Sequence, residues 1–184
     1  MTTAVLALQG AFIEHERRLA DLGERTIELR CAEDLAQPFD RLVLPGGEST
    51  VQGKLLGELG MLAPLRERIE AGMPVLGTCA GLILLARRIE GDGGWLQTLP
   101  VTVRRNAYGR QLGSFHAKGT FGAWDDVPFT FIRAPLIVEA DDAVDVLARV
   151  RGDIIGVRFG NQIGMAFHPE LDPDDRIHQL FLSL

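Results

Sequence analysis

Long apolar runs, lysine and cysteine are all scarce in this sequence. It holds two cysteines in 184 residues, too few for a disulfide framework, and a chain of this length can build a hydrophobic core without covalent cross-links. We therefore interpret Cys31 and Cys79 as thiols. No apolar run approaches the roughly 18 residues of a membrane-spanning helix, and no signal-peptide pattern precedes the first strand-like segment. We expect a cytoplasmic protein.

The basic residues are few and scattered. Lysine occurs only at Lys54 and Lys118, no run is rich in lysine or arginine, and the net charge is −6. An acidic chain without a basic run is a poor match for nucleic acid or for an anionic membrane surface, so small molecules and proteins are the expected partners. Apolar residues make up 46% of the chain and charged residues 24%, as in ordinary globular proteins. We expect a single domain over residues 1–184.

Short apolar runs alternate with helical patterns, which indicates βαβ units and a parallel sheet. In the first half we expect strands at 4–8, 26–29, 41–44 and 74–77, and helices at 14–22, 50–59, 61–71 and 82–89. After the glycine-rich loop at 91–94, we expect strands at 101–104, 129–132, 144–150, 154–158 and 162–167, and a last helix at 174–182. Several of the later strands should be antiparallel, because the gaps between them are too short for crossover helices. The predicted fold is α/β, a three-layer αβα sandwich with a mostly parallel central sheet and antiparallel additions in the second half.

Residues 77–81 (Gly-Thr-Cys-Ala-Gly) follow a predicted strand and precede a helix. This is the arrangement of a nucleophile elbow, in which Gly77 and Gly81 permit a tight turn. Cys79 would then project at the carboxyl edge of the sheet, where ligands of open α/β folds bind. The helix N-terminus favours a nucleophilic thiolate there, and the N–H group of Ala80 is a candidate donor to an oxyanion. Taken alone, the same pattern also fits a small buried core cysteine.

His168 and Glu170 lie just past the last predicted strand, on either side of Pro169. A thiolate mechanism requires a base that takes a proton and returns it to the leaving amine, and imidazole titrates in the right range. Glu170 is placed to hold the imidazole of His168, which would complete a triad. By themselves these residues also fit a solvated turn at a strand end.

A third segment, residues 45–50 (Pro-Gly-Gly-Glu-Ser-Thr), again follows a parallel strand. Gly46 and Gly47 allow backbone N–H groups to point at an acyl oxygen, and Ser49 or Thr50 can cap the next helix. The segment lacks the spacing and the lysine of a phosphate-binding P-loop. A loop of this kind predicts an oxyanion hole, although a simple turn would have the same composition.

Together the three segments resemble those of the class I (triad) glutamine amidotransferases, which have a flavodoxin-like fold. Within that class, four further segments are similar to those of the glutaminase subunits of pyridoxal 5′-phosphate synthase: residues 8–11 (Leu-Gln-Gly-Ala), Arg105 and Asn106 with the Gly-Arg-Gln at 109–111, residues 131–135 (Phe-Ile-Arg-Ala-Pro) and residues 167–171 (Phe-His-Pro-Glu-Leu). The resemblance extends over essentially the whole chain.

The resemblance implies a role for each matching residue. Cys79 would attack the side-chain amide of glutamine, His168 would act as general base and then general acid, and Glu170 would orient His168. The implied glutamine-binding residues are Gly46, Gly47, Glu48, Arg105, Ile132 and Arg133, and the implied oxyanion donors belong to Gly47 and Ala80. Arg105 and Glu48 could pair with the carboxylate and the ammonium of a free amino acid. Without the resemblance, Arg105 and Arg133 would be read as surface charges.

The resemblance also implies a partner. In the family, ammonia passes through a tunnel to a separate (β/α)₈ synthase subunit in a large hetero-oligomer, which condenses it with a pentose phosphate and a triose phosphate to make pyridoxal 5′-phosphate. This chain shows no sugar-phosphate motif, so we assign only glutamine hydrolysis to it. We expect the partner to dock over the pocket mouth near Gln9, Gly10, Gly47 and Ala80, and the isolated chain to be nearly inactive if docking orients the N–H group of Gly47.

Three alternatives stay open at this point. The chain could be another amidotransferase of the same class that feeds imidazole-ring, anthranilate or nucleotide synthesis, a non-catalytic scaffold that retains the fold, or a related cysteine hydrolase that acts on peptides or small electrophiles. No cofactor is expected, and neither is a metal, because His15, His116 and His178 lack paired ligand spacing. The sequence gives no role to Cys31 or His116.

Overall fold

The first half of the chain alternates strands and helices, as predicted. A computed structural model describes residues 1–107 and 114–184. Its first elements are β1 (Thr2–Leu6), α1 (Phe12–Asp21), β2 (Arg25–Leu29), the 3₁₀ helix η1 (Ala32–Ala36), β3 (Arg41–Leu44), α2 (Ser49–Glu58), α3 (Leu62–Glu70), β4 (Val75–Thr78) and α4 (Ala80–Leu85). Within the described ranges, no helix has both the length and the apolar character to cross a bilayer.

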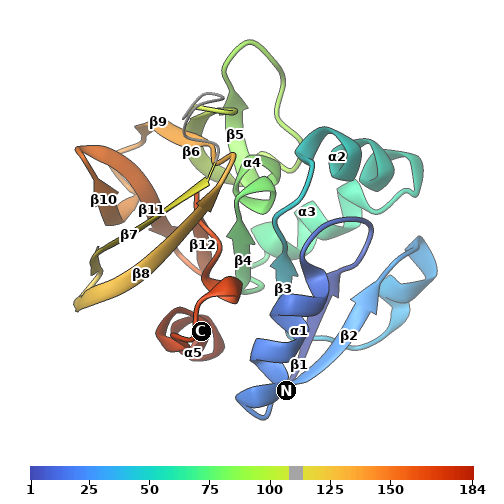
Figure 1. Cartoon of the computed structure of the whole chain (residues 1–184). Helices are drawn as coiled ribbons and strands as arrows, with labels where there is room; N and C mark the ends of the chain where they lie inside the picture. Colours follow the sequence, from blue (N-terminus) through green and yellow to red (C-terminus); the bar gives the residue numbers. More distant parts are fainter. Residues whose placement is uncertain (108–113) are drawn as a thin grey trace.

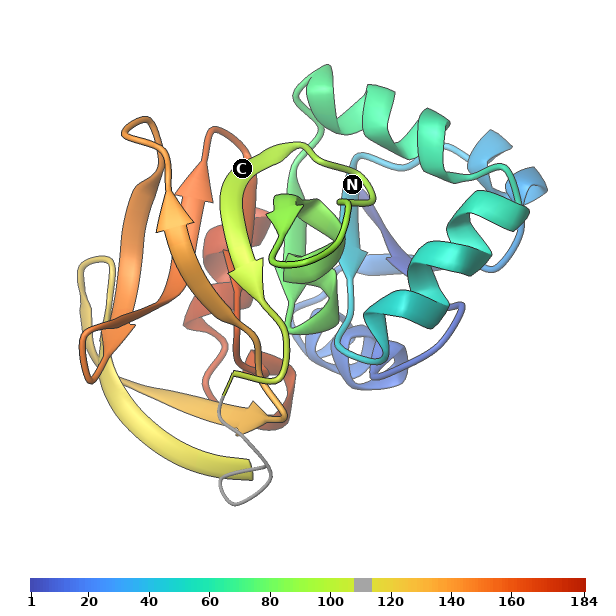
Figure 2. The same ribbon diagram turned by 90° about the horizontal axis from the view of Figure 1, so that it is seen from above.

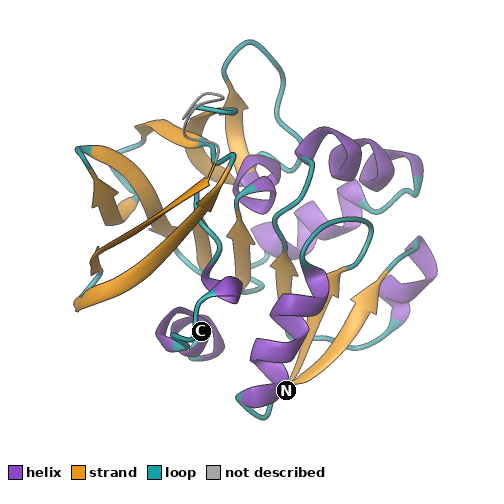
Figure 3. Cartoon of the chain, viewed as in Figure 1, coloured by secondary structure: helices purple, strands orange, loops and turns teal. Residues whose placement is uncertain are grey.

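The second half consists mostly of strands, as Figure 3 shows. Its elements are β5 (Ala86–Ile89), β6 (Leu99–Arg104), β7 (Ser114–Phe121), β8 (Trp124–Ile132), β9 (Leu136–Ala140), β10 (Asp145–Val150), β11 (Asp153–Phe159), β12 (Gln162–Met165), the 3₁₀ helix η2 (Pro169–Leu171) and α5 (Arg176–Leu182). The predicted change of character after residues 91–94 is therefore confirmed.

The main sheet has the strand order β2-β1-β3-β4-β12-β11-β9-β6-β5, with β10 paired to β11. All neighbours from β2 to β12 are parallel. Beyond β12 the pairs of β11 with β12, β9 and β10, and of β9 with β6, are antiparallel, and the edge pair of β5 and β6 is parallel again. The prediction of an α/β fold with antiparallel additions in the second half is confirmed.

Helices cover the parallel part of the sheet. Helix α1 packs on β1 and β2, and α4 packs on β3, β4 and β12. Figure 2 shows α2 and α3 on the side of these strands opposite α1. Strands β3 and β4 are buried along their whole length, which explains why their sequences are continuous apolar runs rather than alternating patterns.

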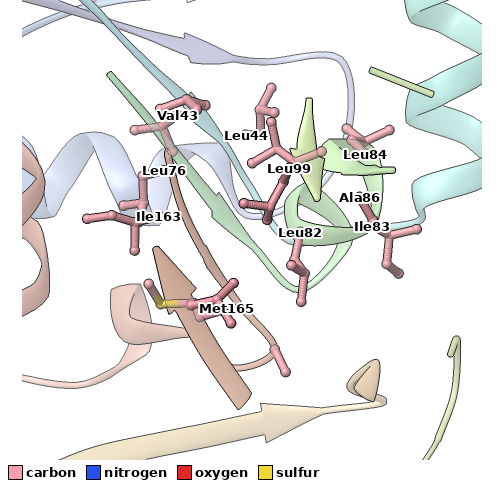
Figure 4. Close-up of a cluster of buried hydrophobic side chains, with 14 of the residues drawn as sticks. Val43, Leu44, Leu76, Leu82, Ile83, Leu84, Ala86, Leu99, Ile163 and Met165 are labelled. Atoms are coloured by element: carbon pink, nitrogen blue, oxygen red, sulfur yellow. The ribbon is translucent and has the colours of Figure 1, made fainter. Parts of the chain in front are cut away.

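The core lies on both faces of the central strands. Figure 4 shows Val43, Leu76 and Ile163, from β3, β4 and β12, grouped on one side of these strands, with the leucine and isoleucine side chains of α4 on the other side. Each of these three side chains is fully buried, and burying one aliphatic side chain of this size stabilises a fold by roughly 1.5–3 kcal/mol. This packing fixes the strand ends from which the polar residues of the next section project.

A separate hairpin of β7 and β8 lies beside the sheet (Figure 1). It is attached through aromatic side chains: Phe129 and Phe131 of the hairpin contact Phe167, which follows β12, at ring-centroid distances of 4.6 and 5.9 Å. The backbone N–H of His168 also donates to the carbonyl of Thr130 in β8 at 2.8 Å. The hairpin therefore holds the segment that follows β12.

Some predicted boundaries are wrong. The helix predicted at 82–89 ends at Leu85, because the backbone turns extended at Ala86 (φ −53°, ψ 136°) and residues 86–89 pair with β6. Strands β7 and β9 were not predicted, since β7 contains Gly119 and Lys118, which are both poor strand formers. The last helix starts at Arg176 rather than at residue 174.

Candidate active site

Three neighbouring strands end at one edge of the sheet. Leu44 of β3 and Gly164 of β12 both lie opposite Gly77 of β4, and all three strands run in the same direction. Residues that follow these strands must therefore meet at the same edge. The edge holds a pocket of about 440 Å³.

Most of the predicted site residues line this pocket. They are Gly46, Gly47, Glu48, Cys79, Arg105, Ile132, Arg133 and His168. Glu170 and Ala80 are not among the described residues that line it. Ala80 is buried as the first residue of α4, and Glu170 is buried beside His168.

Cys79 occupies a strained turn between β4 and α4. Its backbone has φ 49° and ψ −98°, a conformation that costs a non-glycine residue on the order of 1–3 kcal/mol. The turn requires glycine at position 81, because a Cβ atom there would lie 1.9 Å from the carbonyl oxygen of Leu44. The N–H of Cys79 donates to the carbonyl of Met165 in β12 at 2.8 Å. The predicted elbow is confirmed, and two strands hold it.

His168 and Glu170 form a buried pair. Nδ1 of His168 lies 2.6 Å from Oε1 of Glu170, and the two residues are the N-cap and the second residue of the short helix η2. The imidazole also lies directly against the loop after β3, since a Cβ atom on Gly46 would be 2.3 Å from Cε1 of His168. Gly46 is thus the residue that gives the imidazole its space.

Electrostatic interactions favour the charged forms of this pair. Burial lowers the pKa of His168, but the hydrogen bonds and charges of Cys79 and Glu170 raise it to about 10. Burial raises the pKa of Glu170, whereas His15 and the hydrogen bond and charge of His168 bring that pKa below its ordinary value. His168 is therefore an imidazolium facing a carboxylate at neutral pH.

The thiol faces a backbone carbonyl group and the imidazole of His168. Its sulfur lies 3.8 Å from the backbone carbonyl oxygen of Ile132, a weak contact. Nε2 of His168 is buried and has no hydrogen-bond partner among the described residues, although Cys79 contributes to the pKa of His168. Looser geometry of this kind is common before a substrate is bound.

Gln9 and Gln52 brace the loop after β3, a role that the sequence did not indicate. Oε1 of Gln9 accepts from the N–H of Glu48 at 2.7 Å, and Nε2 of Gln52 donates to the backbone carbonyls of Gln9 and Pro45. The helix cap also differs from the prediction. Glu48 is the N-cap of α2 and its Oε1 accepts from the N–H of Thr50 at 3.3 Å, so neither Ser49 nor Thr50 is the cap.

The charged pocket residues from the second half reach the site on loops. Arg105 follows β6, and its guanidinium contacts the hydroxyl of Thr50 at 3.1 Å and the carboxylate of Asp92 at 3.4 Å. Arg133 follows β8 with φ 44°, an uncommon backbone conformation for arginine. The carboxylate of Glu48 and the guanidinium groups of the two arginines therefore surround one cavity. This arrangement suits a ligand that carries both a positive and a negative charge.

Thr78, His15 and His178 form a buried polar group next to the triad residues. Oγ1 of Thr78 accepts from the N–H of Gly46 at 3.0 Å and lies 3.1 Å from Nε2 of His15. His15 and His178 are fully buried, with Nδ1 of His15 3.2 Å from Nε2 of His178. The sequence does carry a signal for His15, because it lies on the same helical face as the buried Leu19, four residues on.

A sequence model of the SNO glutamine amidotransferase family matches residues 5–184. The chain belongs to this family. The pyridoxal 5'-phosphate synthase subunit PdxT of Desulfitobacterium hafniense (strain Y51) is 60% identical over 184 residues, which cover 100% of this chain and 92% of the relative. The protein of the same name from Methanocorpusculum labreanum is 53% identical, over 100% of this chain and 97% of the relative.

A solved structure of a glutamine amidotransferase superposes closely on the model. Its TM-score is 0.93 at 41% sequence identity, over 98% of this chain and 97% of that chain. The α/β fold with a curled, mostly parallel central sheet is consistent with a flavodoxin-like class I glutamine amidotransferase. The segment Gly109, Arg110 and Gln111, part of the resemblance noted from the sequence, lies outside the described residues.

Proposed function

We propose that this chain hydrolyses L-glutamine to L-glutamate and ammonia, as the glutaminase subunit of a pyridoxal 5′-phosphate synthase. The observation that carries the proposal is the convergence of Cys79, the His168–Glu170 pair and the Gly46–Gly47 loop around one pocket at the carboxyl ends of β3, β4 and β12. Family membership and relatives named PdxT support the substrate and the pathway.

In the proposed mechanism the Cys79 thiolate attacks the side-chain amide carbon of glutamine. The negative charge on the amide oxygen is stabilised by N–H groups of Gly47 and Ala80. Ala80 is the first residue of α4, where backbone N–H groups lack partners within the helix. His168 donates its proton to the amide nitrogen, the carbon–nitrogen bond breaks, and ammonia leaves behind a thioester.

Hydrolysis of the thioester reverses these roles. His168, now neutral, takes a proton from a water molecule that attacks the thioester carbon, and glutamate and the Cys79 thiolate are released. Glu170 keeps Nδ1 of His168 protonated through the 2.6 Å contact, so that Nε2 faces the reacting atoms. Every step uses only glutamine, water and groups of this chain.

The pocket suits a free amino acid. In the proposal, Arg105 pairs with the substrate carboxylate and Glu48 with its ammonium group, while Gly46, Gly47, Ile132 and Arg133 complete the binding site. Both charged side chains line the same pocket as Cys79. Contacts of Arg105 with Thr50 and Asp92 place its guanidinium at the pocket wall before substrate arrives.

The partner is proposed to be a synthase subunit that receives the ammonia. The names of the relatives support a synthase partner, and the family resemblance supports a (β/α)₈ subunit in a large hetero-oligomer. Docking near Gln9 and Gly10 would act directly on the oxyanion loop, because the side chain of Gln9 holds the N–H of Glu48. We expect the isolated chain to be much less active than the complex.

We also propose three further features of the chain. A three-layer αβα sandwich is supported by the position of α1 opposite α2 and α3 in Figure 2. A single domain over residues 1–184 is supported by one continuous hydrophobic cluster that includes residues of both halves. The cytoplasmic location stays a prediction.

The decisive experiment mixes the purified chain with a candidate synthase subunit, glutamine, a pentose phosphate and a triose phosphate. We expect glutamate and the chromophore of pyridoxal phosphate to form together. Glutamate without the chromophore would support the amidohydrolase and overturn the pathway. Absence of glutamate from a complex that forms pyridoxal phosphate with added ammonia would overturn the glutaminase.

A further inference from the structure

The second carboxylate oxygen of Glu170 faces a histidine that does not line the pocket. While Oε1 of Glu170 contacts His168, Oε2 lies 3.3 Å from Nε2 of His15. Both side chains are fully buried. The contact is a close approach rather than a well-aligned hydrogen bond, since Oε2 has no partner of hydrogen-bond geometry among the described residues. A buried carboxylate oxygen in this position requires a donor, and His15 is placed to supply it.

The tautomer of His15 decides whether it can do so. Burial lowers the pKa of His15 more than the charge of Glu170 raises it, so His15 is neutral and carries one N–H group. An N–H on Nε2 would be shared between the hydroxyl of Thr78, 3.1 Å away, and Oε2 of Glu170 at 3.3 Å, whereas an N–H on Nδ1 would leave a lone pair facing that negative charge. The carboxylate therefore selects the Nε2–H tautomer.

His178 supports the same choice. Its Nε2 lies 3.2 Å from Nδ1 of His15, and the two rings are tilted by 57° at a centroid distance of 5.4 Å. Burial is the main cause that lowers the pKa of His178 to about 3, so His178 is also neutral. With its own N–H on Nε2, His178 donates to Nδ1 of His15 and leaves the Nε2–H of His15 for Thr78 and Glu170.

We propose that His15 is a positioning residue of the triad, whose Nε2–H group, held in that tautomer by His178, fixes the carboxylate of Glu170 against His168. This inference rests on the proposed function, in which Glu170 orients His168. Helix α1 would hold Glu170 at two points, because His15 contacts its carboxylate and Arg18 of the same helix donates to its backbone carbonyl at 3.3 Å. The charged and titratable groups that act on His15 are Glu170, His168, Glu14 and His178.

The tautomer is tested first, by NMR of the full chain labelled with ¹⁵N at its histidines. Four histidines give few enough signals for assignment by substitution. We expect His15 and His178 to be neutral at pH 7, each with its proton on Nε2. A proton on Nδ1 of His15 would overturn the proposal. This measurement needs neither substrate nor partner, so its outcome is separate from that of the glutaminase assay.

The second test compares His15→Leu with His15→Gln. Leucine removes the donor, while the amide nitrogen of glutamine can replace Nε2. In the complex with the synthase subunit, we expect His15→Leu to lower kcat for glutamine hydrolysis roughly tenfold, with KM changed less than about twofold, because His15 does not line the pocket. His15→Gln should recover most of the loss. Equal activities of the two variants would overturn the proposal.

The titration of His168 distinguishes positioning from general destabilisation. In the wild type we expect His168 to lose its proton at about pH 10. In His15→Leu, and more weakly in His178→Phe, a less firmly held carboxylate should let the proton leave at lower pH. Leu19→Ala is the matched control, because it opens a cavity on the same helix without removing a polar contact. It should lower Tm and leave the titration in place; the same shift in Leu19→Ala would overturn the proposal.

Discussion

The two halves of the sheet contribute different things to the same pocket. In the parallel half, β3, β4 and β12 are buried at every position, and the loops that leave them carry Cys79, His168 and the Gly46–Gly47 segment. In the antiparallel half, β6 of the sheet and β8 of the adjoining hairpin are partly exposed, and the residues that follow them are Arg105 and Arg133. The reacting groups thus follow the buried strands, whereas both cations proposed for the ligand follow the exposed strands.

This division has a physical basis. A covalent mechanism requires the thiol, the imidazole and the oxyanion donors to be held within a fraction of an ångström, and neighbouring buried strands provide that precision. Recognition of an amino acid by charge tolerates more movement, and long arginine side chains can reach the pocket from loops at the edge. Substitutions of the reacting groups should therefore lower kcat, and substitutions of Arg105 or Arg133 should raise KM.

The largest expected effect is that of Cys79→Ala, which removes the nucleophile from the parallel half. Glutamine hydrolysis in the complex should fall by more than about a thousandfold, while glutamine still binds, because the charged residues of the pocket are unchanged. Glutamate release and calorimetric binding of glutamine measure the two effects. Cys31→Ala is the control and should retain full activity; substantial hydrolysis by Cys79→Ala would show that the nucleophile lies elsewhere.

Gly46→Ala should have the next largest effect. The added Cβ would lie 2.3 Å from Cε1 of His168, so the imidazole must move away from the thiol, and we expect kcat to fall roughly a hundredfold. Gly57→Ala is the matched control in α2, where an added Cβ meets nothing within 4 Å. It should raise the free energy of unfolding by about 0.5–1 kcal/mol without changing kcat. A Gly46→Ala enzyme with normal kcat would contradict the assigned position of His168.

Arg105→Ala tests the antiparallel half. Loss of the cation that is proposed to pair with the substrate carboxylate should raise KM about tenfold or more, with a smaller change in kcat. Steady-state kinetics of the complex separate the two constants. The neighbouring Arg104 pairs with Glu90 outside the pocket lining, and Arg104→Ala should leave both constants unchanged. If Arg105→Ala lowered kcat and left KM alone, the proposed division between the halves would be wrong.

The smallest expected effect is on how the free energy of unfolding depends on pH, and it concerns His178 of α5. The pKa of His178 is lowered from 6.5 to about 3, so its unfolded form binds a proton before its folded form does. The stability that this neutral histidine contributes is present above pH 6.5 and is lost as pH falls toward 3. When His178 is replaced by phenylalanine, the free energy of unfolding should fall less steeply as pH decreases, by up to about 1.4 kcal/mol per pH unit.

Urea unfolding at pH 7 and pH 5 measures this slope. Phe181→Leu, on the same buried face of α5, is the control, since it should lower stability equally at both pH values. An unchanged slope in His178→Phe would show that His178 is not buried in its neutral form.

Much of the site could be predicted because its residues follow buried strands. Apolar runs ending in glycine placed Cys79 and Gly46 at strand ends, and parallel pairing of β3 and β4 then required them to be neighbours. The position of His168 depended on a non-local fact, since β12 inserts between β4 and β11 and is parallel to one and antiparallel to the other. The catalytic roles of Cys79, His168 and Glu170 and the oxyanion role of Ala80 stay predictions.

Other features were missed because their causes are not local. The sequence of β5 has the apolar spacing of a helix, and it forms a strand because it pairs with β6. Gln9 and Thr78 carry no sequence signal for the contacts that their side chains make with the loop after β3, from the loop after β1 and from β4. Glu48 caps α2 although serine and threonine follow it, because the turn directs its carboxylate to the N–H of Thr50.

The sequence by itself determined the α/β alternation and the three polar strand ends, because hydrophobic periodicity and glycine turns are local signals that a single chain carries. Only the tertiary structure decided which oxygen of Glu170 faces which histidine and how α1 and α5 meet behind the triad. These contacts join residues as far apart as His15 and His178, and such distant pairs are chosen by the packing of the whole fold rather than by their neighbours in the sequence.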